Sequence, residues 1–107
     1  MRLTVVSQTP EEVLVKVEGR IQLSEEAEVL AQEGRRWLAG GCRLVLDLAG
    51  LQAIGYAGLE VLQQWAEADQ PVVLRHGSDF IQAVLRFHGL TPEEDSQVLQ
   101  GWHPPGT

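Results

Sequence analysis

The residues with reactive side chains are scattered along the chain and match no known catalytic or metal-binding pattern. The histidines, His76, His88 and His103, are widely spaced, and the single thiol, Cys42, is far from them in the sequence. Zinc sites require closely paired ligands, which this spacing does not provide. The sequence contains no Gly-x-Ser-x-Gly motif and no P-loop. We therefore expect a protein that is not an enzyme and that holds no metal and no cofactor.

The acidic clusters have a structural explanation. Glu25–Glu26 and Glu93–Asp95 both fall in the first turn of an expected helix. Carboxylates in that position interact favourably with the helix dipole and with free backbone N–H groups. We interpret both clusters as helix-capping residues rather than as paired catalytic acids.

The segment best suited to binding is Ala53–Gly58, which reads AIGYAG and opens into a helix. It follows the apolar run Leu44–Leu48, which is typical of a strand buried on both faces. A glycine-bracketed turn into a helix presents free backbone N–H groups. Such groups suit a phosphate, a carboxylate or an acidic side chain of a partner protein.

Hydrophobic periodicity predicts the elements that position this segment. The expected strands cover residues 2–7, 12–18, 43–48 and 71–75. Helices are expected over 25–38, with Ser24 as N-cap, over 57–68, over a segment capped by Ser78 or Asp79, and over 92–100. The third of these helices has the spacing of a buried face at Phe80, Ala83, Val84 and Phe87. Gly89 is expected to end it in a left-handed conformation, with Leu90 packed back on Leu85.

The order of these elements indicates an α/β fold. The first two strands read as a hairpin, and the later strands alternate with helices, which implies parallel neighbours joined by crossovers. We expect a mixed four- to five-stranded sheet covered by about four helices. Residues 1–101 are expected to form a single domain, and residues 102–107 a loose C-terminal tail.

Composition narrows the class of protein. A chain of 107 residues with 44% hydrophobic residues suits one globular domain. The formal net charge of −7 argues against nucleic acid as a partner. No apolar run approaches the length of a membrane helix, and the N-terminus lacks a signal-peptide pattern, so we expect a cytoplasmic protein without direct membrane insertion.

The binding segment and its surroundings resemble the STAS family, the domain of bacterial anti-sigma factor antagonists. In that family a strand is followed by Asp-Ser-Ser-Gly-Leu, or Asp-Ser/Thr-x-Gly-Leu, at the start of a helix. This chain reads Gly55-Tyr56-Ala57-Gly58-Leu59 in the same place. The resemblance covers nearly all of the chain, including the first hairpin, a glycine after the second strand (Gly19) and a third helix that closes on Gly89-Leu90.

The resemblance implies a phosphorylation site that this chain has lost. In the family, a kinase-type anti-sigma factor phosphorylates the second hydroxyl of the motif, and Ala57 stands in that slot here. Phosphate at a helix N-terminus changes the local charge and blocks the partner. The sequence has no Ser or Thr between Ser24 and Ser78, and a serine kinase would not use the distant Tyr56 hydroxyl.

The resemblance also indicates a partner-binding surface. Its residues would be Arg20, Ile21, Gln22, Leu23, Gly55, Tyr56, Ala57, Gly58 and Leu59. Tyr56 has two interpretations, an exposed anchor for a partner or a cover over the loop. Arg20 replaces the acid that usually follows the glycine in the family, which suggests a different choice of partner.

We interpret the chain as a protein-interaction module that resembles an anti-sigma factor antagonist without its serine phosphoswitch. One alternative is the STAS subunit of a lipid-transporting ABC complex, whose partner is the transporter ATPase. Another is a STAS domain that binds a small ligand or nucleotide at the N–H groups around Gly58. The sequence does not separate the first two of these functions, because both would use the same loop, and it leaves the oligomeric state open.

Overall fold

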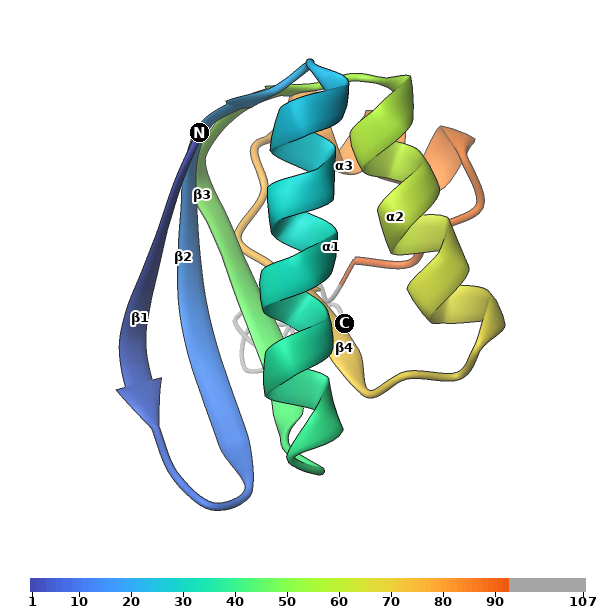
Figure 1. Cartoon of the computed structure of the whole chain (residues 1–107). Coiled ribbons are helices and arrows are strands. Elements are labelled where there is room, and N and C mark those ends of the chain that lie inside the picture. Colours follow the sequence, from blue (N-terminus) through green and yellow to red (C-terminus); the bar gives the residue numbers. More distant parts are fainter. Residues whose placement is uncertain (93–107) are drawn as a thin grey trace, which may run out of the picture.

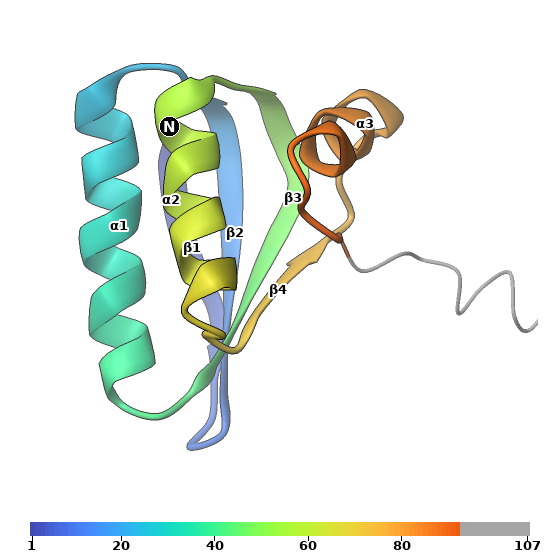
Figure 2. The same ribbon diagram turned by 90° about the vertical axis from the view of Figure 1, so that its right-hand side faces the viewer.

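The computed structural model describes residues 1–92 and shows a mixed α/β fold, with a four-stranded sheet between two helices on one face and one on the other (Figures 1 and 2). The elements are β1 (Arg2–Gln8), β2 (Glu12–Ile21), α1 (Ser24–Ala39), β3 (Arg43–Ile54), α2 (Tyr56–Glu67), β4 (Val72–Arg75) and α3 (Asp79–Phe87). The predicted helix over 92–100 and the predicted tail over 102–107 lie outside the described residues.

The sheet has the strand order β1-β2-β3-β4. β1 pairs with β2 in antiparallel fashion, whereas β2–β3 and β3–β4 are parallel pairs. The mixed sheet and its hairpin were predicted. Residues 1–92 form four strands and three helices, so the upper end of the predicted range, five strands and four helices, exceeds what this part of the chain contains.

The two central strands are longer than predicted. β2 continues to Ile21 instead of ending at residue 18, and β3 continues to Ile54 instead of ending at residue 48. The two extensions pair with each other, from Glu18 with Gly50 to Ile21 with Ile54. Gly19 therefore lies inside a strand, at an irregular register with a φ of 92°. Each extension is stabilised by its partner strand rather than by its own propensity.

Two helices begin at different residues than expected. Leu23, not Ser24, is the N-cap of α1, and Ser24 is its first helical residue. Leu23 has no side-chain acceptor, so the Glu26 carboxylate supplies the capping interaction by accepting hydrogen bonds from the backbone N–H groups of Gln22 and Leu23. α2 begins at Tyr56, directly after its N-cap Gly55.

The hydrophobic core lies between the sheet and the helices. Alternate residues of β2, namely Val13, Val15 and Val17, are fully buried, as the period of a strand requires. β3 contributes Leu44, Leu46 and Leu48. Trp37 and Trp65 are partly buried and pack against this cluster.

The prediction for the buried face of α3 is wrong for three of its four residues, and only Val84 is partly buried against the core. Ile81 and Leu85 are fully buried, whereas Phe80, Ala83 and Phe87 are exposed. Both sets have helical spacing, because the apolar residues of this helix cover more than one face. The predicted end of the helix is confirmed: Gly89 has a φ of 81°, and the Leu90 N–H donates to the Leu85 carbonyl at 2.9 Å.

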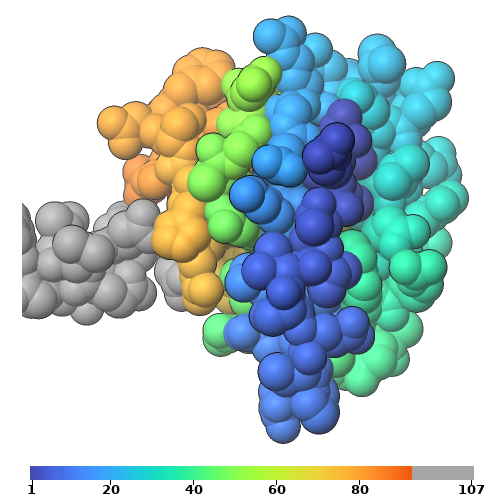
Figure 3. All heavy atoms as spheres, turned by 90° about the vertical axis from the view of Figure 1, so that its left-hand side faces the viewer, coloured from blue at the N-terminus to red at the C-terminus, as the bar shows by residue number. Residues whose placement is uncertain are grey.

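β1 forms one edge of the sheet. Figure 3 shows this strand on the surface, between β2 and α1. Its Val5 and Val6 are exposed, and its register shifts between Val5 and Ser7, which is typical of an edge-strand bulge. No helix among residues 1–92 is long and apolar enough to cross a membrane.

Candidate functional site

The predicted loop Ala53–Gly58 is not a loop. Ala53 and Ile54 end β3, Gly55 is the single connecting residue, and Tyr56 begins α2. The Gly55 N–H donates to the Ile21 carbonyl at 2.7 Å, and the Gly55 carbonyl accepts from the Leu59 N–H at 3.0 Å. Gly55 thus continues the β2–β3 ladder on one side and starts the helix on the other.

Gly58 permits a close approach between α2 and the ends of β2 and β3. A Cβ at this position would lie 2.7 Å from Ile21 Cγ2 and 3.0 Å from Ile54 Cγ1. Any side chain here would push the first turn of α2 away from the sheet. Gly55 is less constrained, because its φ of −95° suits any residue and its Cβ would meet Gln22 at ordinary distances. The two glycines therefore have different roles, and only Gly58 is required by packing.

The segment between β2 and α1 is fixed by hydrogen bonds to Glu26. Its Oε1 lies 2.9 Å from the backbone nitrogens of both Gln22 and Leu23. The N–H groups of Leu23 and Gln22 hold the pKa of the Glu26 carboxyl below its usual range. The terminal amine of Met1 also lies 3.5 Å from Oε2 of the same carboxylate.

The structure brings the two predicted partner-binding segments together. The N-termini of α1 and α2 lie at the same end of the molecule (Figure 1), and β2 pairs with β3 up to Ile21 and Ile54. Tyr56 is 73% exposed and Leu23 is 60% exposed. We call the group that faces solvent at this end the Tyr56 surface: Arg20, Gln22, Leu23, Tyr56 and the half-buried Ala57.

Not every predicted site residue belongs to this surface. Ile21, Gly58 and Leu59 are buried, so their side chains support the surface and are not available to a partner. Gly55, the residue before Tyr56, is half-buried. Burial of Ile21 could not be inferred because the expected strand ended at residue 18, whereas Leu59 belonged to the helix expected over 57–68.

The Tyr56 surface combines side chains of different chemistry. Its tyrosine ring and the guanidinium of Arg20 are groups enriched in protein interfaces, and Leu23 adds an aliphatic side chain. The first turn of α2 carries no acidic residue. Residues 1–92 contain no group of three or more His, Cys, Asp or Glu side chains placed to hold a metal ion.

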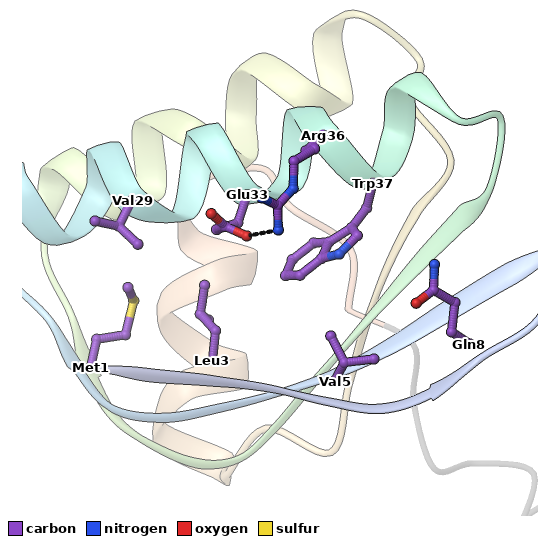
Figure 4. A pocket seen from close by; sticks show the side chains of 8 residues that line it. All are labelled: Met1, Leu3, Val5, Gln8, Val29, Glu33, Arg36 and Trp37. Carbon is purple, nitrogen blue, oxygen red and sulfur yellow. Dashed lines mark hydrogen bonds and ion pairs between the residues drawn. The ribbon is translucent and has the colours of Figure 1, made fainter.

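Sequence reasoning did not find a groove between β1 and α1. It has a volume of about 500 Å³, with Met1, Leu3, Val5 and Gln8 on one side and Val29, Glu33, Arg36 and Trp37 on the other (Figure 4). Arg36 and Glu33 form an ion pair at 2.6 Å along its α1 side. None of its lining residues belongs to the Tyr56 surface. The valines of β1 were the available sequence signal for this groove, but an ordinary strand accounts for them equally well.

Comparison with known sequences assigns most of the chain to one family. The family model described as "Mlab, STAS domain" matches residues 4–99. No sequence among curated proteins matches this chain.

Comparison with solved structures shows the same fold. The anti-sigma factor antagonist SpoIIAA in its unphosphorylated form matches with a TM-score of 0.64 at 12% identity, over 92% of this chain and 94% of that one. The Bacillus cell fate determinant SpoIIAA in the phosphorylated form matches with a TM-score of 0.60 at 13% identity, over 94% of this chain and 98% of that one. At such identities the likeness establishes the fold only.

Proposed function

The chain belongs to the STAS domain family, and from this premise we propose that it is a non-enzymatic protein-interaction module. We propose further that it acts as an anti-sigma factor antagonist-like regulator whose serine phosphoswitch is lost. The likeness of its fold to SpoIIAA supports this choice among the functions of interaction modules. Residues 1–101 would form the whole module.

The observation that carries the proposal is the residue at position 57. Ala57 lies in the first turn of α2, in the slot that the family resemblance assigns to the phosphorylated hydroxyl. Its half-buried methyl group packs against the core and offers no acceptor for phosphate. A module of this kind would bind its partner without being released by a serine kinase.

The Tyr56 surface is the proposed contact with the partner. Tyr56 is the exposed first residue of α2, next to the Ala57 slot. The pairing of β2 with β3 up to Ile21 and Ile54 brings Arg20 and Leu23 to the same end of the sheet. An exposed tyrosine flanked by an aliphatic side chain is a suitable anchor for a partner pocket. The Arg20 guanidinium favours an acidic group on the partner at the rim of the contact.

Two other functions remain as alternatives. The description of the matching family as "Mlab, STAS domain" favours, as the first, a STAS subunit whose partner is the ATPase of a lipid-transporting ABC complex. The second is a small-ligand or nucleotide-binding domain that uses the N–H groups in the first turn of α2. The protein-partner proposals use the same surface, so the identity of the partner distinguishes them.

The proposal is tested by measuring binding of the full chain to candidate anti-sigma factors and ABC ATPases of the same host, identified from neighbouring genes. Tyr56→Ala should weaken binding by about 2 kcal/mol or more, because truncation of a central aromatic anchor typically costs that much. Gln64→Ala, an exposed change two turns further along α2, is the matched control and should bind normally.

The outcome also selects between the alternatives. Binding to an ATPase that is lost in Tyr56→Ala would replace the anti-sigma assignment with the transporter one. Normal binding of Tyr56→Ala to the true partner would refute the Tyr56 surface and leave only the family and the fold.

A further inference from the structure

Leu23 and Tyr56 are the large hydrophobic side chains of the Tyr56 surface, and the backbone segments that carry them lie next to each other. Leu23 follows Gln22 in the chain, and Tyr56 follows Gly55. A Cβ at Gly55 would lie 3.5 Å from the Gln22 Cα and 3.6 Å from the Gln22 carbonyl oxygen. The backbone conformation of residues 22–23 therefore determines where the Leu23 side chain lies relative to Tyr56.

The N-cap of α1 is occupied by a residue that cannot cap. Serine, threonine, aspartate and asparagine are preferred at this position because their side chains accept a hydrogen bond from the first turn. Ser24 would serve, but it is the first helical residue, and Leu23 stands at the N-cap instead. The Leu23 side chain makes no capping hydrogen bond and is 60% exposed. An aliphatic side chain left in solvent beside Tyr56, at the expense of a cap, is typical of a contact residue.

Glu26 supplies the hydrogen bonds that hold this segment. Its Oε1 accepts from the backbone N–H groups of Gln22 and Leu23, each at 2.9 Å. On the other side of the segment, the Ile21 carbonyl accepts from the Gly55 N–H at 2.7 Å. Residues 22–23 are therefore tied to β3 through Ile21 and to α1 through Glu26.

We propose that Glu26 is a positioning residue for partner binding: it fixes residues 22–23 so that Leu23 serves as a second anchor beside Tyr56. The inference rests on the proposed function, since it requires that the Tyr56 surface meets a partner. The half-buried Glu26 carboxylate is occupied by its own chain, so it acts through Leu23 and not on the partner directly. A side chain whose backbone is ordered before association loses less conformational entropy on binding.

Amide hydrogen exchange in the full chain tests the positioning without a partner. Glu26→Ala should speed exchange at Gln22 and Leu23 by about fivefold, because loss of a capping interaction shifts a local equilibrium by roughly that factor. Glu26→Gln should exchange nearly as the native chain does, since its amide oxygen can accept both hydrogen bonds. Glu25→Ala removes an acidic group from the same turn and leaves these bonds in place, so it is the matched control. Unchanged exchange in Glu26→Ala would refute the positioning role.

A double-mutant cycle in binding tests whether Glu26 acts through Leu23. The probe is the anti-sigma factor or ABC ATPase, encoded by a neighbouring gene, that binds the native chain. Glu26→Ala and Leu23→Ala should each weaken binding by about fivefold, and the double variant should bind as Leu23→Ala does. Glu26→Gln should bind like the native chain, which would not occur if the partner responded to the charge of Glu26. Additive losses from Glu26→Ala and Leu23→Ala would refute the proposal.

The outcomes separate this inference from the proposed function. Weakened binding of Tyr56→Ala together with normal binding of Glu26→Ala would refute the positioning role and leave the Tyr56 surface in place. Normal binding of both Tyr56→Ala and Leu23→Ala would refute the surface itself, and the positioning role with it.

Discussion

Gly34 of α1 lies directly against the indole of Trp65 in α2. A Cβ at Gly34 would overlap the Trp65 ring, with Cη2 only 2.5 Å away. The two helices, which cover one face of the sheet (Figure 2), therefore approach each other through Gly34 and Trp65. The absence of a side chain at position 34 fixes how closely α1 and α2 pack.

Gly34→Ala should lower the free energy of unfolding by about 2 kcal/mol, because overpacking a close contact outweighs the gain in helix propensity. Urea unfolding measures the change. Gly40→Ala is the matched control, since its Cβ would meet only the Trp37 carbonyl oxygen at 3.6 Å. Stabilisation by Gly34→Ala would mean that the helices are further apart than described.

Ala57→Ser should create a phosphorylation site that the native chain lacks. Incubation with a kinase-type anti-sigma partner and ATP should add one phosphate to Ala57→Ser and none to residues 25–77 of the native chain, because these contain no Ser or Thr. Intact mass and peptide mapping measure the result. A phosphopeptide of the native chain that maps to Tyr56 would contradict the prediction.

Nucleotides should not bind at the start of α2. The chain is acidic and lacks the lysine with which a P-loop holds phosphates. In addition, the side chains of Ile21 and Ile54 pack closely against Gly58. Calorimetric titration with ATP or GTP should therefore give no saturable heat. A one-site binding curve that Tyr56→Ala weakens would move the protein to the ligand-binding class.

Glu26 should contribute to the acid sensitivity of the fold. Because hydrogen bonds from the Leu23 and Gln22 N–H groups lower its pKa in the folded state, its ionised form stabilises the native chain above the usual glutamate range. This contribution should be lost as the pH falls through that range towards the lowered pKa. The free energy of unfolding, measured as a function of pH, should fall less with acid in Glu26→Gln than in the native chain.

The control for this pH dependence is Glu25→Gln. It removes the same charge one residue earlier and leaves both hydrogen bonds to Glu26 in place. Its stability should fall with acid as in the native chain. A pH profile of Glu26→Gln that parallels the native one would show that the carboxylate does not stabilise this turn.

The sequence was sufficient to predict the mixed sheet, the hairpin and the Gly89 cap, because each depends on local patterns. It was not sufficient to find the ends of β2 and β3. Gly50 and Ala53 have low strand propensity, and they extend β3 because β2 pairs with them at Glu18 and Arg20. Such pairing is a property of the folded chain and has no local signal.

Only part of the candidate site could be predicted from the sequence, because the rest also depends on contacts made in the folded chain. The proximity of the Tyr56 segment to Arg20–Leu23 follows from the parallel order of β2 and β3, whereas the sequence left the exposure of Tyr56 open. The burial of Ile21 and Gly58 does not follow from this order, because it depends on how closely α2 approaches the two strand ends. The face of α3 could not be chosen either, since Phe80 and Ile81 each belong to a helical apolar pattern.

The single residue that connects β3 to α2 determines how the Tyr56 surface would meet a partner. Gly55 is hydrogen-bonded on both sides, to the Ile21 carbonyl and from the Leu59 N–H. The backbone that carries Tyr56 is therefore already ordered by these two hydrogen bonds before association. Recognition at this surface would be of the preorganised kind, in which the entropy of ordering falls on the partner's segment and not on this chain.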